Sequence, residues 1–349
     1  MKKKTKINAF FAAIGMLTII LDTETARNGA AEGIDLCIKT VIPSLFPFFI
    51  LSAMVCSNLL GQTIPFLRPI GKLCKIPVGA ESILLLGLTA GYPVGAQLIT
   101  EAYKEKALSK DTAKRMLGFC NNAGPAFIFG MVALLFERNS LSWILWLIHL
   151  LSALIVGFVL PYKTDSSCVA SNCKPQPVAA LLESSIKTMG TVCGWIIVFR
   201  IILAFCTRWF LWRLPMIIQV LLIGLIELSN GCFFLQKIPQ ESTRFLIASF
   251  ILSAGGVSVW MQTRSVTGNM GTGFFLTGKV LQCLFSVGLS SLCIPFLFPN
   301  DSQFSIVTAI LFLLVTMIIV IFLLNFQKSC SNRRKNAVYY LYKFKKGAI

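Results

Sequence analysis

The chain has 349 residues, 56% of them hydrophobic and 13% charged, with a formal net charge of +18. A soluble domain carries about 25% charged residues, so the composition excludes an ordinary soluble enzyme and predicts a protein that crosses the membrane several times. The Lys and Arg residues gather in short loops and at both chain ends. That distribution is typical of membrane topology and of attraction to anionic lipids, whereas a nucleic-acid-binding protein would carry a basic folded domain.

Apolar segments of about 20 residues, the length that a helix needs to cross the bilayer, recur along the chain. We predict an all-α polytopic bundle with about eight such spans and two shorter apolar segments that enter the membrane and return. Residues 1–30 hold the first span, an N-terminal signal anchor, and a cleaved signal peptide is the alternative. The predicted spans are Ile7–Leu21, Leu36–Leu60, Ala113–Phe136, Leu141–Leu160, Ile186–Cys206, Phe245–Met261, Phe274–Phe298 and Ile306–Asn325.

The first of the shorter segments, Ser82–Thr100, is interrupted by Gly-Tyr-Pro-Val-Gly. Gly permits positive φ angles and Pro ends a helix, so the segment forms a re-entrant hairpin with this tip or crosses with a break. Non-helical backbone inside the membrane is tolerated only against protein or a water-filled cavity. Free N–H groups at such a tip suit an anion, and a plain tight turn is the alternative. The candidate substrate-binding residues are Gly91, Tyr92, Pro93, Gly95 and Gln97.

A second interruption, Asn121-Asn122-Ala123-Gly124-Pro125, divides the predicted span Ala113–Phe136. The amide side chains can bond polar groups of a substrate, and the freed carbonyl groups can coordinate a cation. The alternative is that the amides cap the two half-helices. Asn121, Asn122 and Gly124 are therefore candidate substrate-binding residues.

The second ambiguous segment, Pro215–Leu235, carries Glu227 near its middle. A carboxylate in hydrocarbon costs on the order of 3 kcal/mol, so Glu227 must face a cavity, pair with a cation or be protonated. We expect proton coupling, cation coordination or a substrate hydrogen bond, with a structural pairing to Arg200 or Lys279 as the alternative. Ser229 and Asn230, at the same predicted hairpin tip, are candidates with it.

Several cations fall within predicted spans, and they would favour an anionic substrate over a neutral one. Lys39 and Lys187 each follow an acidic residue by four positions near a span end, so we interpret them as surface pairs whose long side chains reach the interface. Arg200 has no such partner and is the remaining candidate among them.

Loop charge favours hairpins over full crossings. With the Lys2–Lys6 end in the cytoplasm and both ambiguous segments folded as hairpins, Lys and Arg concentrate in the cytoplasmic loops. Two full crossings would reverse that excess, against the positive-inside rule. We therefore predict a multi-pass protein of the cell membrane with both termini in the cytoplasm.

The two halves of the chain are predicted to be related. Residues 162–182 form a polar, Pro-containing cytoplasmic linker between a first repeat, 31–161, and a second repeat, 183–300; residues 301–349 add a span and a basic tail. Each repeat holds a span, a hairpin, a broken span and a further span. Three crossings are an odd number, so the second copy must be inverted, which is the arrangement of many secondary transporters.

The first-half motifs resemble a known family. Pro43-Ser44-Leu45-Phe46-Pro47-Phe48-Phe49, the Gly91 hairpin tip and Cys120-Asn121-Asn122-Ala123-Gly124-Pro125 are similar to the sporulation integral membrane proteins of the nucleoside-recognition (Gate) class. Gly224 to Gly231 resembles the matching element of that family's second half. The resemblance implies a fold like that of concentrative nucleoside transporters. It also implies a role in endospore formation, where such proteins are linked to moving dipicolinate into the spore, which suggests the forespore membrane.

These features together predict a transporter or facilitator of a small polar or anionic metabolite that works by alternating access. A nucleoside-type transporter and a non-transporting membrane scaffold of sporulation are the alternatives. The sequence holds no P-loop, HExxH or GxSxG motif and a single histidine, so we expect no enzyme and no bound metal or cofactor. The expected partners are the small-molecule substrate, membrane lipids and a second copy in a homo-oligomer, with Na⁺ or H⁺ as the coupling ion.

Overall fold

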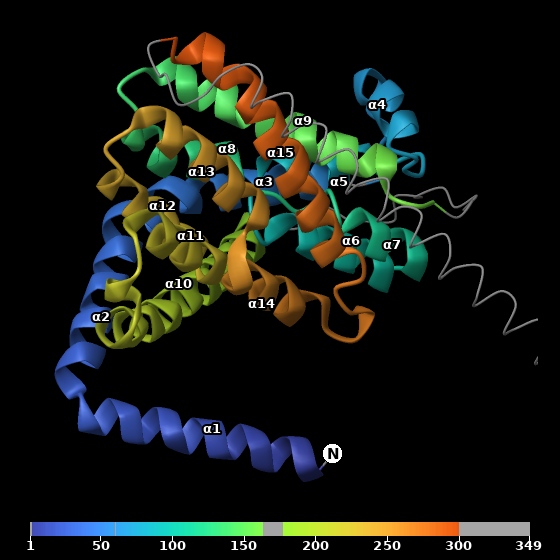
Figure 1. Ribbon diagram of the computed structural model, residues 1–349. Helices are drawn as coiled ribbons and strands as arrows, with labels where there is room; N and C mark the ends of the chain where they lie inside the picture. Colours follow the sequence, from blue (N-terminus) through green and yellow to red (C-terminus); the bar gives the residue numbers. More distant parts are fainter. Residues whose placement is uncertain (1, 60, 163–176, 300–349) are drawn as a thin grey trace, which may run out of the picture. The chain divides into compact units, whose positions relative to one another are not determined.

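The computed structural model describes residues 2–59, 61–162 and 177–299 (Figure 1). Within these ranges the chain forms helices and loops, with no strand. The predicted all-α membrane protein is therefore confirmed at this level. The chain divides into two units, Met1–Ser286 and Val287–Ile349, and the residues of the candidate site all belong to the first. The predicted span Ile306–Asn325, the basic tail and most of the linker lie outside the described residues.

The N-terminal helices differ from the prediction in their bounds. α1 spans Lys2–Leu21, and Asp22 then caps α2 (Thr23–Leu36) by accepting a hydrogen bond from the Thr25 N–H. A π-helical turn, η1 (Cys37–Val41), joins α2 directly to α3 (Ile42–Leu59). The predicted boundary at residue 30 therefore falls inside a helix, because Gly29 and Gly33 let α2 pack closely on the backbone of a long later helix.

The first half continues as short helical pieces and one long helix. Ser109 accepts from the Thr112 N–H to cap one piece, and Pro125 opens another after a non-helical segment. The elements are η2 (Pro65–Leu67), α4 (Arg68–Leu73), α5 (Glu81–Thr89), α6 (Val94–Lys104), α7 (Lys110–Met116), α8 (Pro125–Phe127), η3 (Ile128–Val132), η4 (Ala133–Leu135) and α9 (Asn139–Val159).

The second half consists of a long helix, a short 3₁₀ turn, two pairs of interrupted helices and a final long helix (Figure 1). Its first helix begins at Val178, so the last residues of the predicted linker are helical. The elements are α10 (Val178–Trp209), η5 (Leu211–Arg213), α11 (Met216–Ile226), α12 (Leu228–Phe234), η6 (Leu235–Lys237), α13 (Glu241–Ala254), α14 (Gly256–Thr267), η7 (Gly268–Met270) and α15 (Phe275–Leu297).

Fewer segments qualify as spans than the sequence predicts. Among the described residues, 5 are long and apolar enough to cross a membrane. The predicted span Ala113–Phe136 is not one of them, because its central residues leave the helix between α7 and α8. The five segments are Thr23–Leu59, Asn139–Val159, Val178–Trp209, Glu241–Met270 and Phe275–Leu297.

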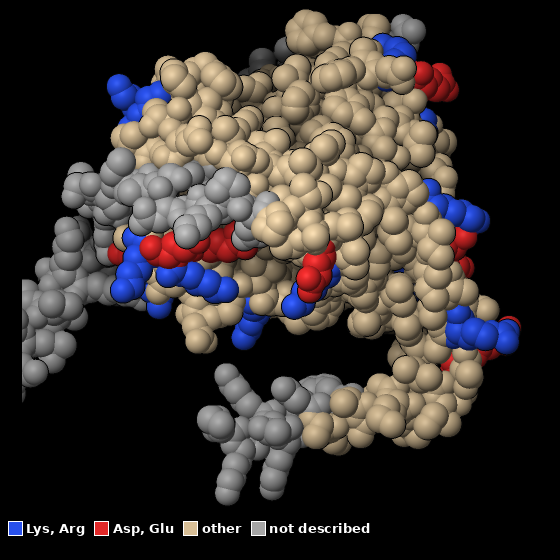
Figure 2. Space-filling view, turned by 180° about the vertical axis from the view of Figure 1, so that it is seen from behind, with Lys and Arg blue, Asp and Glu red and all other residues tan. Residues whose placement is uncertain are grey.

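Charged side chains stand at the margins of an otherwise uncharged surface. Figure 2 shows one face on which uncharged residues form a continuous area, with Lys, Arg, Asp and Glu at its edges. Large apolar side chains such as Trp143, Leu147 and Leu151 of α9 are exposed on the surface of the molecule. Exposed apolar area of this extent is what a lipid-facing helix requires. The interior, by contrast, holds buried polar groups, among them Asn121, Asn122 and Glu227.

Candidate functional site

The first ambiguous segment folds as a helical hairpin. α5 and α6 have 9 and 11 residues, and at 1.5 Å per residue neither reaches the roughly 30 Å that a membrane crossing needs. The tip holds Gly91 with a φ of +87° and a cis bond between Tyr92 and Pro93. The arms leave room for another backbone segment: a Cβ on Gly87 would lie 2.2 Å, and one on Gly95 1.9 Å, from the Cys120 carbonyl oxygen.

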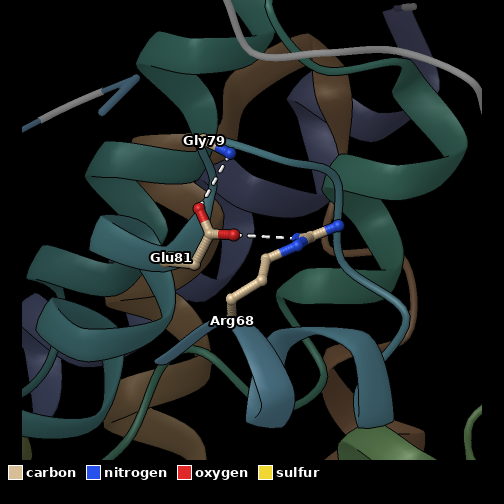
Figure 3. Close-up of polar contacts among 3 residues, drawn as sticks. All are labelled: Arg68, Gly79 and Glu81. Carbon is tan, nitrogen blue, oxygen red and sulfur yellow. Dashed lines mark hydrogen bonds and ion pairs between the residues drawn. The ribbon is translucent and has the colours of Figure 1, made fainter. Parts of the chain in front are cut away.

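An ion pair between a buried carboxylate and a partly exposed arginine fixes the base of this hairpin (Figure 3). Glu81, the first residue of α5, is fully buried and accepts a hydrogen bond of 2.8 Å from Arg68 Nη1 of α4. Its other oxygen accepts one of 2.8 Å from the Gly79 N–H. Both carboxylate oxygens are therefore engaged, and the hairpin starts from a defined position against α4.

The first break lies between the arms of that hairpin, and its two asparagines have defined roles. Asn121 Oδ1 accepts from the Ala96 N–H of α6 at 3.3 Å, and its Nδ2 donates to Thr263 Oγ1 of α14 at 3.0 Å. Asn122 Nδ2 donates to the Phe119 carbonyl at 2.6 Å and more weakly to that of Gly87. The asparagines thus hold the non-helical backbone in place and tie it to the second half of the chain.

The second hairpin turns at Glu227, whose carboxylate caps α12. Oε1 accepts from the Ser229 N–H at 3.1 Å, and Oε2 accepts from the Asn230 N–H at 2.6 Å and from Asn230 Nδ2 at 2.8 Å. Ser258 Oγ of α14 adds a weaker bond at 3.4 Å. Glu227 is 1% exposed, so these donors replace water around its charge. The predicted alternative partners Arg200 and Lys279 do not contact it, and the helix N-terminus stabilises it instead.

The second break forms at Gly255 and Gly256, which have φ angles of +70° and +76°. A Cβ on Gly256 would lie 2.9 Å from the carbonyl oxygen of Gly224 and close to those that follow it in α11. The first break has the same relation to its own hairpin, since a Cβ on Gly124 would lie 2.8 Å from the Thr89 carbonyl oxygen at the end of α5. In both halves a glycine of the break therefore packs on the carboxyl end of the first hairpin arm.

One cavity is lined by both hairpin tips, by the first break and by α14, the helix that follows the second break. The space open to the centre of a water molecule measures about 30 Å³, enough for a few waters, since one needs about 10–15 Å³ on this kind of measure. Apolar residues of α3 and α10 close it. The lining from the interrupted helices includes Gly91 and Tyr92 of the first hairpin, Gly124 of the first break, Glu227 and Ser229 of the second hairpin, and Gln262 of α14.

A buried lysine lies behind Tyr92. Lys279 of α15 is 3% exposed, and its Nζ donates to Asn122 Oδ1 at 3.0 Å and to Gln282 Oε1 at 2.7 Å. The same nitrogen lies 5.1 Å from the centre of the Tyr92 ring. Tyr92 Oη has no hydrogen-bond partner in the described part of the chain. From the sequence, Lys279 is expected only as one of several cations within spans and as an alternative partner of Glu227; its contact with Asn122 spans 157 residues and is not predicted.

Seven predicted site residues do not line the cavity. Pro93 and Gly95 shape the first hairpin, Asn121 and Asn122 position the first break, and Asn230 holds Glu227. The remaining two lie elsewhere: Gln97 donates to Thr188 Oγ1 of α10 at 2.8 Å, and Arg200 pairs with Glu32 of α2 and lies 5.1 Å from the Phe234 ring centre. Arg200 therefore joins two helices, and the counter-charge that the sequence did not reveal is Glu32.

A comparison with known proteins agrees with the sequence motifs. The chain is 27% identical over 340 residues to the sporulation integral membrane protein YlbJ of Bacillus subtilis (strain 168), and the match covers 81% of this chain and 82% of that protein. The chain is a relative of this sporulation protein. The predicted resemblance to sporulation integral membrane proteins is thereby confirmed, whereas the name of the relative states no substrate.

Other comparisons add no assignment. No family model matches the chain, so the Gate domain stays a prediction from the motifs. No solved structure matches it, and the likeness to concentrative nucleoside transporters is likewise a prediction.

Proposed function

We propose that the chain is a sporulation-associated membrane carrier that moves a small polar or anionic metabolite, dipicolinate-like in character, by alternating access. The observation that carries the proposal is the cavity at which helix interruptions from both halves meet. Discontinuous helices that converge from two related halves are how many secondary transporters build a substrate site. The similarity to the sporulation integral membrane protein YlbJ supports the sporulation context, and a place in the forespore membrane belongs to the same proposal.

The small cavity is consistent with a closed state. A pyridine ring with two carboxylates needs far more than the space of a few waters, and ligand sites for molecules of this kind are about 300–1,000 Å³. Binding therefore requires movement of the hairpins relative to α3 and α10. The glycine-lined tips and breaks are the places where backbone rotation costs least.

The scaffold alternative is weakened by the second break. Its sequence, Ser253-Ala254-Gly255-Gly256, lacks the asparagines and the proline of the first. The helix is nevertheless interrupted there, and α14 brings Val259 and Gln262 to the cavity. A protein that kept the fold without the activity would have no need to keep an interrupted helix, which leaves backbone groups without helical partners.

Flux into proteoliposomes tests the proposal. Radiolabelled pyridine-2,6-dicarboxylate and uridine are offered separately to the purified protein, with proton and sodium gradients varied independently. Saturable uptake of the dicarboxylate is the expected result, and a dependence on one gradient would identify H⁺ or Na⁺ as the coupling ion. Uptake of uridine alone would favour the nucleoside carrier. No flux of either substrate from folded protein would contradict this proposal and favour the scaffold.

A further inference from the structure

Lys279 is a buried cation that lacks an anion. Its ammonium group contacts two amide oxygens and lies 5.1 Å and 5.7 Å from the ring centres of Tyr92 and Phe275. No carboxylate pairs with it among the described residues. Burying a charge without a counter-ion is costly, and aromatic faces and neutral amides compensate only part of that cost.

The two amides are fixed with their oxygens toward the lysine. Asn122 Nδ2 donates to backbone carbonyls of the first break, and Gln282 Nε2 donates to the His149 carbonyl of α9 at 3.3 Å. Each amide has one acceptor and one NH₂ group, so the occupied NH₂ leaves only the oxygen for Lys279. The ammonium is therefore held at one place before any ligand arrives, which is the preorganisation that a binding site needs.

The Tyr92 ring borders both this ammonium and the cavity. Tyr92 lines the cavity, and the centre of its ring lies 5.1 Å from Lys279 Nζ. Its hydroxyl makes no hydrogen bond in the described part of the chain, so no bond must be broken for it to move. Gly91 precedes it in the chain, and Gly255 adds no side chain beside its hydroxyl, since a Cβ there would lie 3.2 Å from Tyr92 Oη.

On these grounds we propose that Lys279 binds a carboxylate group of the transported anion, and that Tyr92 moves aside to join its pocket to the cavity. The inference rests on the proposed function, and it assigns the charged contact to Lys279 rather than to Glu227 or Arg200, the two charged residues predicted to bind substrate. Glu227 cannot serve this purpose, because it is an anion and is already saturated by the donors of α12. Arg200 is paired with Glu32 and lies outside the cavity lining.

Binding to detergent-solubilised full-length protein tests the inference through ligand charge. Pyridine-2,6-dicarboxylate is compared with its neutral isostere pyridine-2,6-dicarboxamide by calorimetry. The wild type is expected to prefer the dicarboxylate. Lys279→Gln keeps hydrogen-bond donors and removes the charge, so it should weaken dicarboxylate binding about tenfold or more while it leaves diamide binding within about twofold. Lys187→Gln, on an exposed lysine of α10, is the matched control and should change neither.

A second variant covers the case in which Lys279→Gln does not fold. Gln282→Glu has nearly the same shape and places a carboxylate where Oε1 now lies 2.7 Å from Nζ. This internal counter-ion should compete with the ligand and lower dicarboxylate affinity selectively. Equal losses for both ligands, or no preference of the wild type for the dicarboxylate, would overturn the inference.

The binding assay and the flux assay separate this inference from the proposed function. Charge-selective binding without flux would leave the inference standing and contradict the carrier proposal. Flux that persists unchanged in Lys279→Gln would support the carrier proposal and contradict the role of Lys279.

Discussion

Glu227 combines a folding role with a place in the cavity lining. Its two carboxylate oxygens accept four hydrogen bonds, three of them from the first turn of α12. The same residue lines the cavity. A substitution at this position therefore changes both the local helix and the site. The stability of each variant must be measured together with its flux.

Replacing Glu227 with Gln should destabilise the protein. The introduced NH₂ group would face N–H donors, so at least one hydrogen bond to the charged group is lost, at a cost of about 1.5–3 kcal/mol. We expect a lower melting temperature in detergent, measured by tryptophan fluorescence, and reduced flux in proteoliposomes. Glu24→Gln, on the exposed face of α2, is the control and should melt like the wild type. An unchanged melting temperature for Glu227→Gln would show that the cap is not formed.

Individual site residues were predictable where the residue type conflicts with its surroundings. A carboxylate or an asparagine within an apolar segment needs hydrogen-bond partners for its polar atoms. Glu227, Asn121 and Asn122 therefore stand out in the sequence. The residues that form hydrogen bonds with them cannot be identified from the sequence. Lys279 meets Asn122 across 157 residues, and no local spacing rule reports a contact that only the packing of α15 on the first break creates.

At the scale of elements, the glycines of the hairpins decide how closely the breaks can approach. Gly95 has no space for a side chain, because its Cβ would lie 1.9 Å from the Cys120 carbonyl oxygen. Gly190 of α10 is the opposite case, with nothing within 4 Å. The two positions form a matched pair in helices of the same protein.

Gly95→Ala should therefore be costly and Gly190→Ala should not. Inserting a methyl group into packed backbone costs about 1–3 kcal/mol or more, whereas Ala in an open helical position gains up to about 1 kcal/mol over Gly. We expect Gly95→Ala to lower the folded yield and the melting temperature, and Gly190→Ala to maintain or raise them. Equal behaviour of the two variants in size-exclusion chromatography and thermal melting would contradict the close contact.

The ion pair at the base of the first hairpin is expected to be cooperative. Arg68→Met leaves the buried Glu81 carboxylate without its cation, and removing one partner of a buried pair costs about 3–5 kcal/mol. Glu81→Gln keeps an acceptor for the Gly79 N–H. The double variant should therefore be more stable than Arg68→Met alone in a thermal double-mutant cycle. Additive losses would mean that the pair in Figure 3 contributes no coupling.

The order of elements followed from the sequence better than their bounds did. Gly, Pro and Asn within apolar segments located both interruptions of the first half, because these residues end helices for local reasons. The junction of α2 with α3 was missed, since α2 is polar on one face and has a mean hydropathy too low to suggest a span. Its helical state depends on packing against α10, where Gly29 and Gly33 meet the backbone around Ile197 and Ile201.

At the scale of the whole molecule, the two hairpins should return to opposite sides of the membrane. In the predicted topology an odd number of crossings separates them: the broken segment from α7 to η4, which is too interrupted to qualify as a span by itself, then α9, then α10. The two flanks of each hairpin, in contrast, should lie on one side, because the arms are too short to cross. The second hairpin is folded back on itself as tightly as glycine allows, since a Cβ on Gly231 would lie 2.3 Å from the Gly224 Cα.

Labelling of single introduced cysteines with a membrane-impermeant reagent tests this topology. Lys72→Cys and Lys110→Cys flank the first hairpin at exposed positions, and Arg213→Cys and Gln236→Cys flank the second. We expect the first pair to label only from the cytoplasmic side and the second pair only from the opposite side, with the unsubstituted chain as the background for native thiols. If the members of a pair label from different sides, that segment crosses the membrane. The inverted arrangement of the two halves would then be wrong, because one further crossing makes the number of crossings in that repeat even.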